Sequence, residues 1–312
     1  MKSVTIFSSA FSGSEKIAHM TSAAIGCKWI RDSEIIELVH KKAGIKQDIL
    51  HKTINCSPPL RNQFTHKKNQ VITNIKMILS EIISKEPVVL CGFLGQLIPR
   101  QLSMKVLINA GSSFRAQQFL RETGISGGNA TKQLRMHDKQ LFTWIRYLKE
   151  KSIWNESDYD VIIPSDHMTV DESVALITKA FAENSSKNED ALHDFHLETK
   201  IESLLNQKKH DIGVSVKNGI VDLIINNKVL MLNRFEKKLI KMASAIPGVQ
   251  SVKTQIGKHF HRSDMVCKHE FHRHETPVYD HIEKEYNLLY QEAKQNRAEN
   301  EIIEESHQEI WA

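Results

Sequence analysis

The sequence predicts an α/β protein in which a parallel sheet, with helices on both faces, precedes a small α+β domain and a C-terminal helix. Two observations support this prediction. In the first half, short apolar strands alternate with helices, which is typical of a parallel sheet covered on both sides. In the second half, two short strands meet at Asn218-Gly219, and Asn-Gly is the strongest short signal for a β-hairpin.

The composition is typical of a globular protein with a modest net charge. The chain has 312 residues, of which 40% are hydrophobic, and a formal net charge of +5. It is long enough for two domains, and its basic residues form no long run, so we expect no nucleic-acid partner. No apolar run approaches the ~18 residues of a membrane span, and residues 1–4 lack the apolar core of a signal peptide. The four cysteines show no C-x-x-C spacing. We therefore expect a cytoplasmic protein with reduced thiols and no transmembrane segment.

The elements of the first domain, residues 1–183, follow from apolar runs and helical periodicity. The helix that starts at Asp32 is capped by Asp32 or Ser33 and closed by Gly44. The predicted strands are Val4–Phe7, Val88–Cys91, Lys105–Asn109 and Val161–Ile163, and the predicted helices are Glu15–Ile25, Asp32–Ala43, Gln63–Ser84, Ser113–Thr123, Asn129–Lys149 and Val170–Ala182.

The second half of the chain has a different order of predicted helices and strands. A polar segment, residues 184–196, is predicted to be a linker. Residues 197–256 then follow the order α-β-β-α-β, with a turn at Pro247-Gly248 before the last strand. The predicted elements are the helix Leu197–Asn206, the strands Gly213–Val216 and Ile220–Ile225, the helix Arg234–Ser244 and the strand Val249–Thr254.

The remaining residues form a histidine-rich segment, 257–281, and an acidic helix, 282–312. Histidine is a preferred ligand of borderline divalent metals, and His269, His272 and His274 are the candidate metal ligands. The alternative is a polar segment whose histidines are simply exposed. The acidic helix has an apolar stripe, so we expect it to dock on a partner protein or on its own chain.

A loop of small residues follows the first predicted strand and precedes a helix. This layout is typical of a phosphate-binding loop, in which backbone N–H groups converge on phosphate oxygens at the positive end of a helix. The G-x-x-x-x-G-K-[ST] template is not met, because its two glycines fall on Ala10 and Glu15. The loop therefore binds phosphate weakly or has become a plain turn. The candidate phosphate-binding residues are Ser12, Gly13, Ser14 and Lys16.

Four segments in the same order along residues 1–182 carry a family resemblance. They are the loop Ser12–Ser14, the segment Asp32–Leu38, Arg115 after the strand Val106–Ala110, and the pair Asp138-Lys139. Together they resemble the cytidylate-kinase-like family, a branch of the P-loop nucleoside monophosphate kinases. The resemblance implies a nucleotide site, with ATP and Mg²⁺ as cofactors if the domain is functional. It adds Asp32, Arg115, Asp138 and Lys139 to the candidate nucleotide-binding residues.

The departures from the family pattern fall where phosphate should be bound. Glycine or cationic positions of the family hold Phe11, Glu15, Phe93, Gln118 and Leu141. Phosphoryl transfer depends on positioning and on cations that neutralise developing charge. We therefore expect a degenerate domain that serves as a sensor or scaffold, with weak or no nucleotide phosphorylation and no assigned catalytic residue. The alternative is an active enzyme that transfers phosphate from ATP to CMP or dCMP.

Residues 197–255 resemble a second family, the BON domain, a small bacterial module. The matching segments are Val214–Val216, Asn218–Leu223 and Ile246–Val252. The resemblance implies an unknown small ligand or a phospholipid as partner, and no residue of the segment looks catalytic. A third reading follows, in which the chain is a metal- or lipid-responsive binding protein that uses this module and the histidines.

Overall fold

The computed structural model describes residues 2–50, 62–124, 132–138, 158–183, 188–206, 212–226, 228–257 and 260. The chain divides into two units, Met1–His261 and Arg262–Ala312. The candidate metal ligands His269, His272 and His274 and the predicted acidic helix lie outside the described residues, as does Lys139. Of the predicted helix Asn129–Lys149, only residues 132–138 are described, and they are helical.

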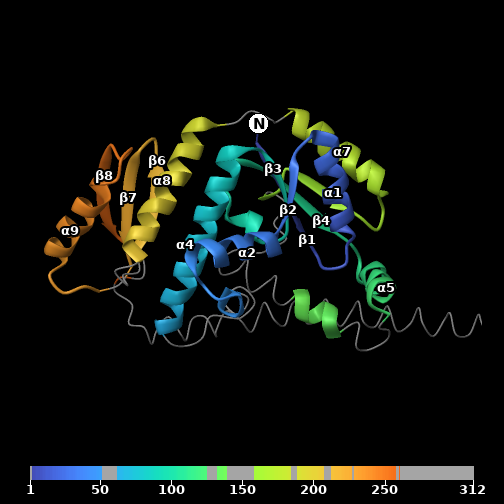
Figure 1. Ribbon diagram of the computed structural model, residues 1–312, viewed down its shortest axis with the longest axis horizontal. Coiled ribbons are helices and arrows are strands. Elements are labelled where there is room, and N and C mark those ends of the chain that lie inside the picture. The colour runs from blue at the N-terminus through green and yellow to red at the C-terminus, as the bar shows by residue number, and fades with distance from the viewer. Residues whose placement is uncertain are drawn as a thin grey trace, which may run out of the picture. The chain divides into compact units, whose positions relative to one another are not determined.

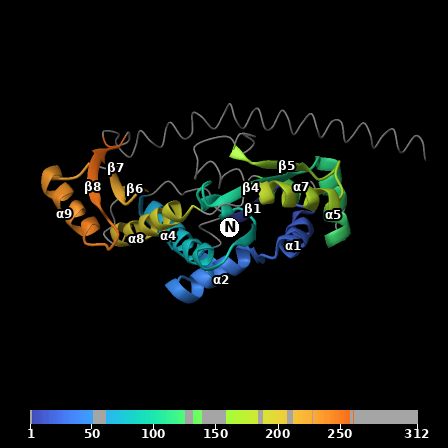
Figure 2. The ribbon, with the colours of Figure 1, turned by 90° about the horizontal axis from the view of Figure 1, so that it is seen from above.

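Five parallel strands form the first sheet, in the order β2-β3-β1-β4-β5. Figure 1 labels the first four of these strands, and Figure 2 labels β5 near β4. The central strand β1 pairs with β3 on one side and β4 on the other. Because the strands are parallel, their carboxyl ends share one edge, where open α/β sheets bind ligands. The strands are β1 (Ser3–Ser8), β2 (Lys28–Arg31), β3 (Val88–Cys91), β4 (Ser103–Asn109) and β5 (Val161–Pro164).

Helices cover both faces of this sheet, which confirms the predicted fold class. Alternate residues of the strands enter different cores: Val4 and Ile6 pack with residues of α1 and α7, whereas Phe7 packs with residues of α2 and α4. Figure 2 shows α1 beside α7, in agreement with the contacts between them. The helices are α1 (Ser14–Ile25), α2 (Asp32–Ala43), α4 (Asn62–Lys85), α5 (Ser112–Thr123) and α7 (Val170–Glu183).

Two details of this domain differ from the sequence-based expectation. The edge strand β2 was not predicted, because only Trp29 and Ile30 of its four residues are apolar. The cap of α2 was predicted at Asp32 or Ser33, but Arg31 is the N-cap residue. Glu34 accepts a hydrogen bond from the Arg31 backbone N–H at 2.9 Å, so the side chain three residues into the helix closes this end.

The second sheet has three strands in the order β6-β7-β8. β6 (Ile212–Lys217) and β7 (Ile220–Ile225) are antiparallel, and β8 (Ser251–Ile256) runs parallel to β7. Asn218 and Gly219 have φ angles of 52° and 72°, as a type I′ hairpin turn requires. With α8 (Glu189–Asn206) and α9 (Leu232–Ser244), the segment has the predicted order α-β-β-α-β.

The helix α8 contributes to two hydrophobic cores. Leu192 and Phe195 join the core of the five-stranded sheet, whereas Leu197, Ile201 and Leu205 join that of the three-stranded sheet. The helix begins at Glu189, so the second half of the segment predicted as a linker, 184–196, is helical. Burial of Leu192 and Phe195 on one face favours the helix there over an irregular linker.

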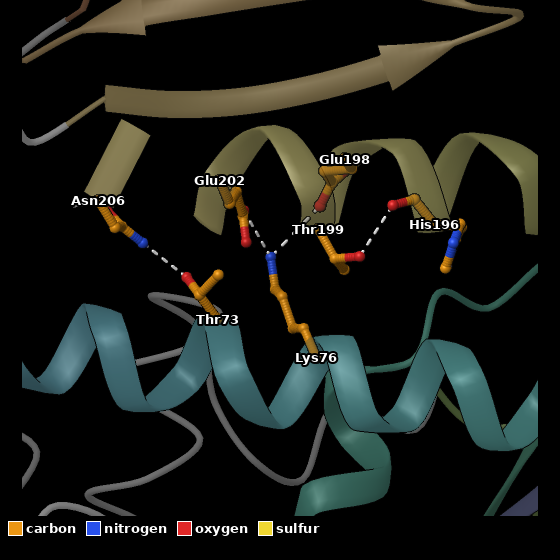
Figure 3. Close-up of polar contacts among 7 residues, drawn as sticks. All are labelled: Thr73, Lys76, His196, Glu198, Thr199, Glu202 and Asn206. Atoms are coloured by element: carbon orange, nitrogen blue, oxygen red, sulfur yellow. Dashed lines mark hydrogen bonds and ion pairs between the residues drawn. The ribbon is translucent and has the colours of Figure 1, made fainter. Parts of the chain in front are cut away.

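Polar contacts hold α8 against α4 (Figure 3). The Lys76 ammonium group lies 2.8 Å from the Glu202 carboxylate and 3.3 Å from the Glu198 carboxylate. The Asn206 side chain donates a hydrogen bond to the Thr73 hydroxyl at 2.7 Å. None of the helices within the described ranges has the length and apolar character needed to cross a membrane.

Candidate functional site

The loop between β1 and α1 has two residues in left-handed backbone conformation. Gly13 has a φ angle of 75° and precedes the first residue of α1, Ser14. Phe11 has a φ angle of 59°, a region that glycine occupies freely and bulky residues avoid. The first N–H groups of α1 have no acceptor within the helix and carry partial positive charge. The loop therefore has the strand-turn-helix backbone of a phosphate-binding loop, with an aromatic residue at a strained position.

The ring of Phe11 is held by aromatic contacts from two helices. It meets the Phe119 ring of α5 edge-on, with ring centroids 4.8 Å apart, and the His137 ring at 5.9 Å. His137 belongs to the short helix 132–138. Edge-to-face aromatic pairs are worth about 0.5–1.5 kcal/mol beyond their buried area, which is enough to offset much of the strain at Phe11.

The hydroxyl groups at the loop differ in whether they have a hydrogen-bond partner. Ser14 accepts a hydrogen bond from the Ser8 hydroxyl at 2.8 Å. The hydroxyls of Ser9 and Ser12 are buried, and no residue in the described part of the chain bonds them. A buried hydroxyl without a partner costs free energy, and a phosphate oxygen is one acceptor that would relieve this cost.

Arg115 connects the loop with the helix 132–138. Its Nε donates to the Ala10 carbonyl oxygen at 2.7 Å, and its Nη2 donates to the Asp138 carboxylate at 2.6 Å. The side chains of Arg115 and Asp138 are only 9% and 13% exposed. The structure thus brings together two candidate nucleotide-binding residues, and they neutralise each other.

Asp32 lies at the start of α2 and supports the turn after β3. Its carboxylate accepts hydrogen bonds from the backbone N–H groups of Phe93, at 2.8 Å, and Leu94, at 3.2 Å. Burial of the carboxyl group raises its pKa to about 7, although both hydrogen bonds act to lower it. Gly92 has a φ angle of 137°, and a Cβ atom there would lie 2.3 Å from the Asp32 carboxylate. Only glycine fits at this position.

The remaining candidates are more scattered. Lys16 lies on the exposed surface of α1, beside the exposed Glu15, which brings a negative charge to the first turn. Cys91, the last residue of β3, precedes Gly92, which lies against the Asp32 carboxylate. Burial and the Asp32 charge raise the pKa of the Cys91 thiol to about 12. The site therefore gathers the loop, Arg115, Asp138 and Asp32, but not Lys16.

Two residues after β5 were missed by the sequence reasoning. Ser165 donates its hydroxyl hydrogen bond to the Ser12 carbonyl oxygen at 2.7 Å, and the Asp166 carboxylate accepts one from the Gly111 N–H at 2.8 Å. The signal was available in principle, because Ser165 directly follows a strand whose carboxyl end lies at the ligand edge. Their position depends on β5 lying beside β4, which the sequence does not specify.

The described residues provide a poor site for a divalent metal. Mg²⁺ prefers carboxylate, hydroxyl and water oxygens. The Ser14 hydroxyl is hydrogen-bonded to the Ser8 hydroxyl, and the Asp32 carboxylate to two backbone N–H groups. The described ranges contain no group of three or more His, Cys, Asp or Glu side chains placed to hold a metal ion. The residues present therefore do not fit a protein-held Mg²⁺.

Comparisons with known proteins find one matching family and several similar solved structures. A model of the cytidylate kinase-like family matches residues 3–167. An uncharacterized protein from Eubacterium ventriosum ATCC 27560 is similar in structure, with 14% identity and a TM-score of 0.42 over 60% of this chain and 100% of that chain. Shikimate kinase from Acinetobacter baumannii in complex with shikimate matches with 12% identity and a TM-score of 0.37, over 60% of this chain and 96% of that chain. Shikimate kinase from Bacteroides thetaiotaomicron matches with 11% identity and a TM-score of 0.37, over 57% of this chain and 98% of that chain. No curated protein matches the sequence.

Proposed function

The chain belongs to the cytidylate kinase-like family, and from this premise we propose that its parallel-sheet domain binds a nucleotide or phosphate group weakly and does not transfer phosphate. In this proposal the domain serves as a sensor or scaffold. It has the loop and the helix N-terminus that its family uses for phosphate, but it lacks several groups that phosphoryl transfer needs.

The observation that supports the proposal most is the position of Phe11 and the packing of its side chain. The family has a glycine at this position, which lets the backbone approach phosphate closely. Here the Phe11 ring packs edge-on against the rings of Phe119 and His137. A close approach of phosphate to this part of the loop would require these aromatic contacts to rearrange.

The charged side chains near the loop also support the proposal. Glu15 replaces the cation of the family in the first turn of α1, and Arg115 already bonds a carboxylate. A carboxylate near a transferring phosphate repels it, whereas a cation stabilises the charge of the transition state. Losing one such cation typically costs about a hundredfold in rate, so losing several together favours a domain without useful turnover.

A transfer assay on the full chain tests this proposal. The protein is incubated with ATP, Mg²⁺ and either CMP or dCMP, and nucleoside diphosphate formation is measured, while a titration with ATP measures binding. We expect weak binding and no product above background. Turnover above about 1 per second, in the ordinary range of enzymes, would instead establish the alternative, an active cytidylate kinase-like enzyme.

A second proposed function belongs to the three-stranded domain, which resembles the BON module. We propose that it binds an anionic phospholipid or another small ligand. Leu230 and Met231, just before α9, are 94% and 72% exposed. The exposed residues of α9 itself are largely basic, and a protruding apolar pair beside basic side chains suits an anionic lipid surface. The basic residues are Arg234, Lys237, Lys238 and Lys241.

Vesicle sedimentation tests this second function. The full chain is mixed with phosphatidylcholine vesicles with or without phosphatidylserine. We expect it to sediment only with the anionic vesicles, and the variant Leu230→Ser/Met231→Ser to stay in solution. Equal sedimentation with both vesicle types, or none with either, would contradict an anionic lipid ligand.

A further inference from the structure

We propose that the Asp138 carboxylate is an internal competitor for the phosphate site: it occupies Arg115 when no ligand is bound, and a phosphate group displaces it. This inference rests on the proposed function, because it takes a phosphate group as the ligand of the loop. It goes further by assigning one residue that limits affinity and one contact that binding would break.

The first support is the chemistry of the pair. A guanidinium group binds carboxylate and phosphate oxygens through the same planar array of N–H donors. The Nη2 of Arg115 lies 2.6 Å from an Asp138 oxygen, a short charge-assisted hydrogen bond. Because the two side chains are only 9% and 13% exposed, water screens this attraction little. Asp138 thus satisfies Arg115 much as a phosphate oxygen would.

The second support is the position of Arg115. Its Nε donates to the carbonyl oxygen of Ala10, which belongs to the loop itself. The guanidinium group is therefore anchored at the loop through Nε, while its Nη2 bonds Asp138. An anion bound at the loop would meet the positive charge of Arg115 and would repel the Asp138 carboxylate.

The third support is that the loop and the helix 132–138 make two contacts side by side. Ala10 is linked to Asp138 through Arg115, and the next residue, Phe11, contacts His137, the residue before Asp138. Loss of the ionic contact would remove one of these two neighbouring contacts and leave the edge-on aromatic one, worth about 1 kcal/mol. Anion binding at the loop should therefore loosen the helix 132–138.

The test compares the wild type with Asp138→Asn, which keeps the shape of the side chain and removes its charge. ATP and inorganic phosphate are titrated against each full-length protein. We expect Asp138→Asn to bind both about tenfold more tightly, because the competing charge-assisted bond becomes a neutral one. The variant Glu122→Gln serves as the charge control, since it removes the same charge at the exposed end of α5; its affinity should equal that of the wild type.

The outcomes separate this inference from the proposed function. If the wild type binds ATP and Asp138→Asn binds it no more tightly, the competitor role is wrong and the proposed function stands. If neither protein binds ATP or phosphate, both are wrong. An equal gain in Glu122→Gln would assign the effect to net charge and would also overturn the competitor role.

A measurement on the wild type alone covers the case in which Asp138→Asn does not fold. Hydrogen exchange is followed in the amides of residues 132–138 with and without saturating ATP. We expect faster exchange with ATP, because the ionic contact that holds this helix is broken. Unchanged or slower exchange with bound ATP would overturn the inference.

Discussion

Asp32 and Lys105 hold opposite ends of the same short turn, η1 (Leu94–Leu97). Asp32 accepts the N–H groups that enter the turn, and the buried Lys105 ammonium group donates to the carbonyl oxygens of Gly95 and Ile98, each at 2.8 Å. An anion at the N–H end and a cation at the carbonyl end both complement the dipole of a helical turn. The turn after β3 is therefore fixed by one residue of α2 and one of β4, and nucleotide contact by Asp32 stays a prediction.

The raised pKa of Asp32 predicts a pH dependence of stability. The folded protein holds this proton with a pKa of about 7, against 3.8 for the unperturbed group. Between these values the folded state binds more protons than the unfolded chain. The contribution of Asp32 to the free energy of unfolding should therefore fall as the pH rises from about 4 to 7, by at most ~1.4 kcal/mol per pH unit, and level off above about 8.

Urea unfolding of the wild type and of Asp32→Asn, at several pH values from 5 to 8, measures this effect. The difference between the two free energies of unfolding isolates Asp32, because other titrating groups cancel. We expect the free energy of unfolding of the wild type to fall relative to that of Asp32→Asn as the pH rises to 7. A difference independent of pH would show that the Asp32 pKa is unperturbed.

Gly92→Ala should destabilise the protein by about 2–4 kcal/mol, since it adds both a clash and backbone strain. The new Cβ atom would lie 2.3 Å from the Asp32 carboxylate, and the φ angle of 137° disfavours any side chain. Gly26→Ala is the matched control, because it has a φ angle of 67° and nothing lies within 4 Å of its Cβ position. It should cost only about 1 kcal/mol. Equal losses in thermal or urea unfolding would exclude the clash with Asp32.

Lys76→Met should weaken the contact between α4 and α8. Without the ammonium group, Glu198 and Glu202 face each other, and burial already raises the pKa of Glu198. We expect a loss of about 2 kcal/mol in the free energy of unfolding near pH 8, less than for a fully buried pair because Lys76 is 19% exposed. The loss should shrink as the pH falls, because the Glu198 carboxyl group, whose pKa is raised by burial, takes up a proton.

The exposed pair of Lys41 and Glu37 provides the control for Lys76. Lys41→Met should change the stability little, because both side chains are more than half exposed. The triple variant Lys76→Met/Glu198→Gln/Glu202→Gln should regain most of the lost stability. If it does not, Lys76 stabilises α8 through its alkyl chain and not through its charge.

Repair of the loop should strengthen nucleotide binding. Phe11→Gly permits close approach of the backbone, and Glu15→Arg replaces a repelling carboxylate by a cation. Each change should contribute about 1 kcal/mol to phosphate affinity, so the double variant should bind ATP more tightly, by roughly tenfold or more, in a calorimetric titration. The single variants separate the two effects. Unchanged affinity in a folded double variant would mean that this loop is not a nucleotide site.

The sequence by itself determined most of the elements and the turns between them, because their signals are local. Apolar runs placed four strands of the first sheet, and Asn218-Gly219 placed the hairpin, since these residues accept the positive φ angles of its turn. The series of weak motifs along the first half agreed with the family that matches residues 3–167.

Only the tertiary structure decided which distant residues meet. Trp29 and Ile30 form a strand because β3 lies beside them, and α8 starts early because Leu192 and Phe195 reach the core of the first sheet. Arg115 and Asp138 are 23 residues apart, and nothing local in the sequence reveals that the carboxylate of one occupies the guanidinium of the other. Such pairings depend on the packing of the whole domain, which fixes the distances between side chains, whereas a local pattern specifies only the conformation of its own segment.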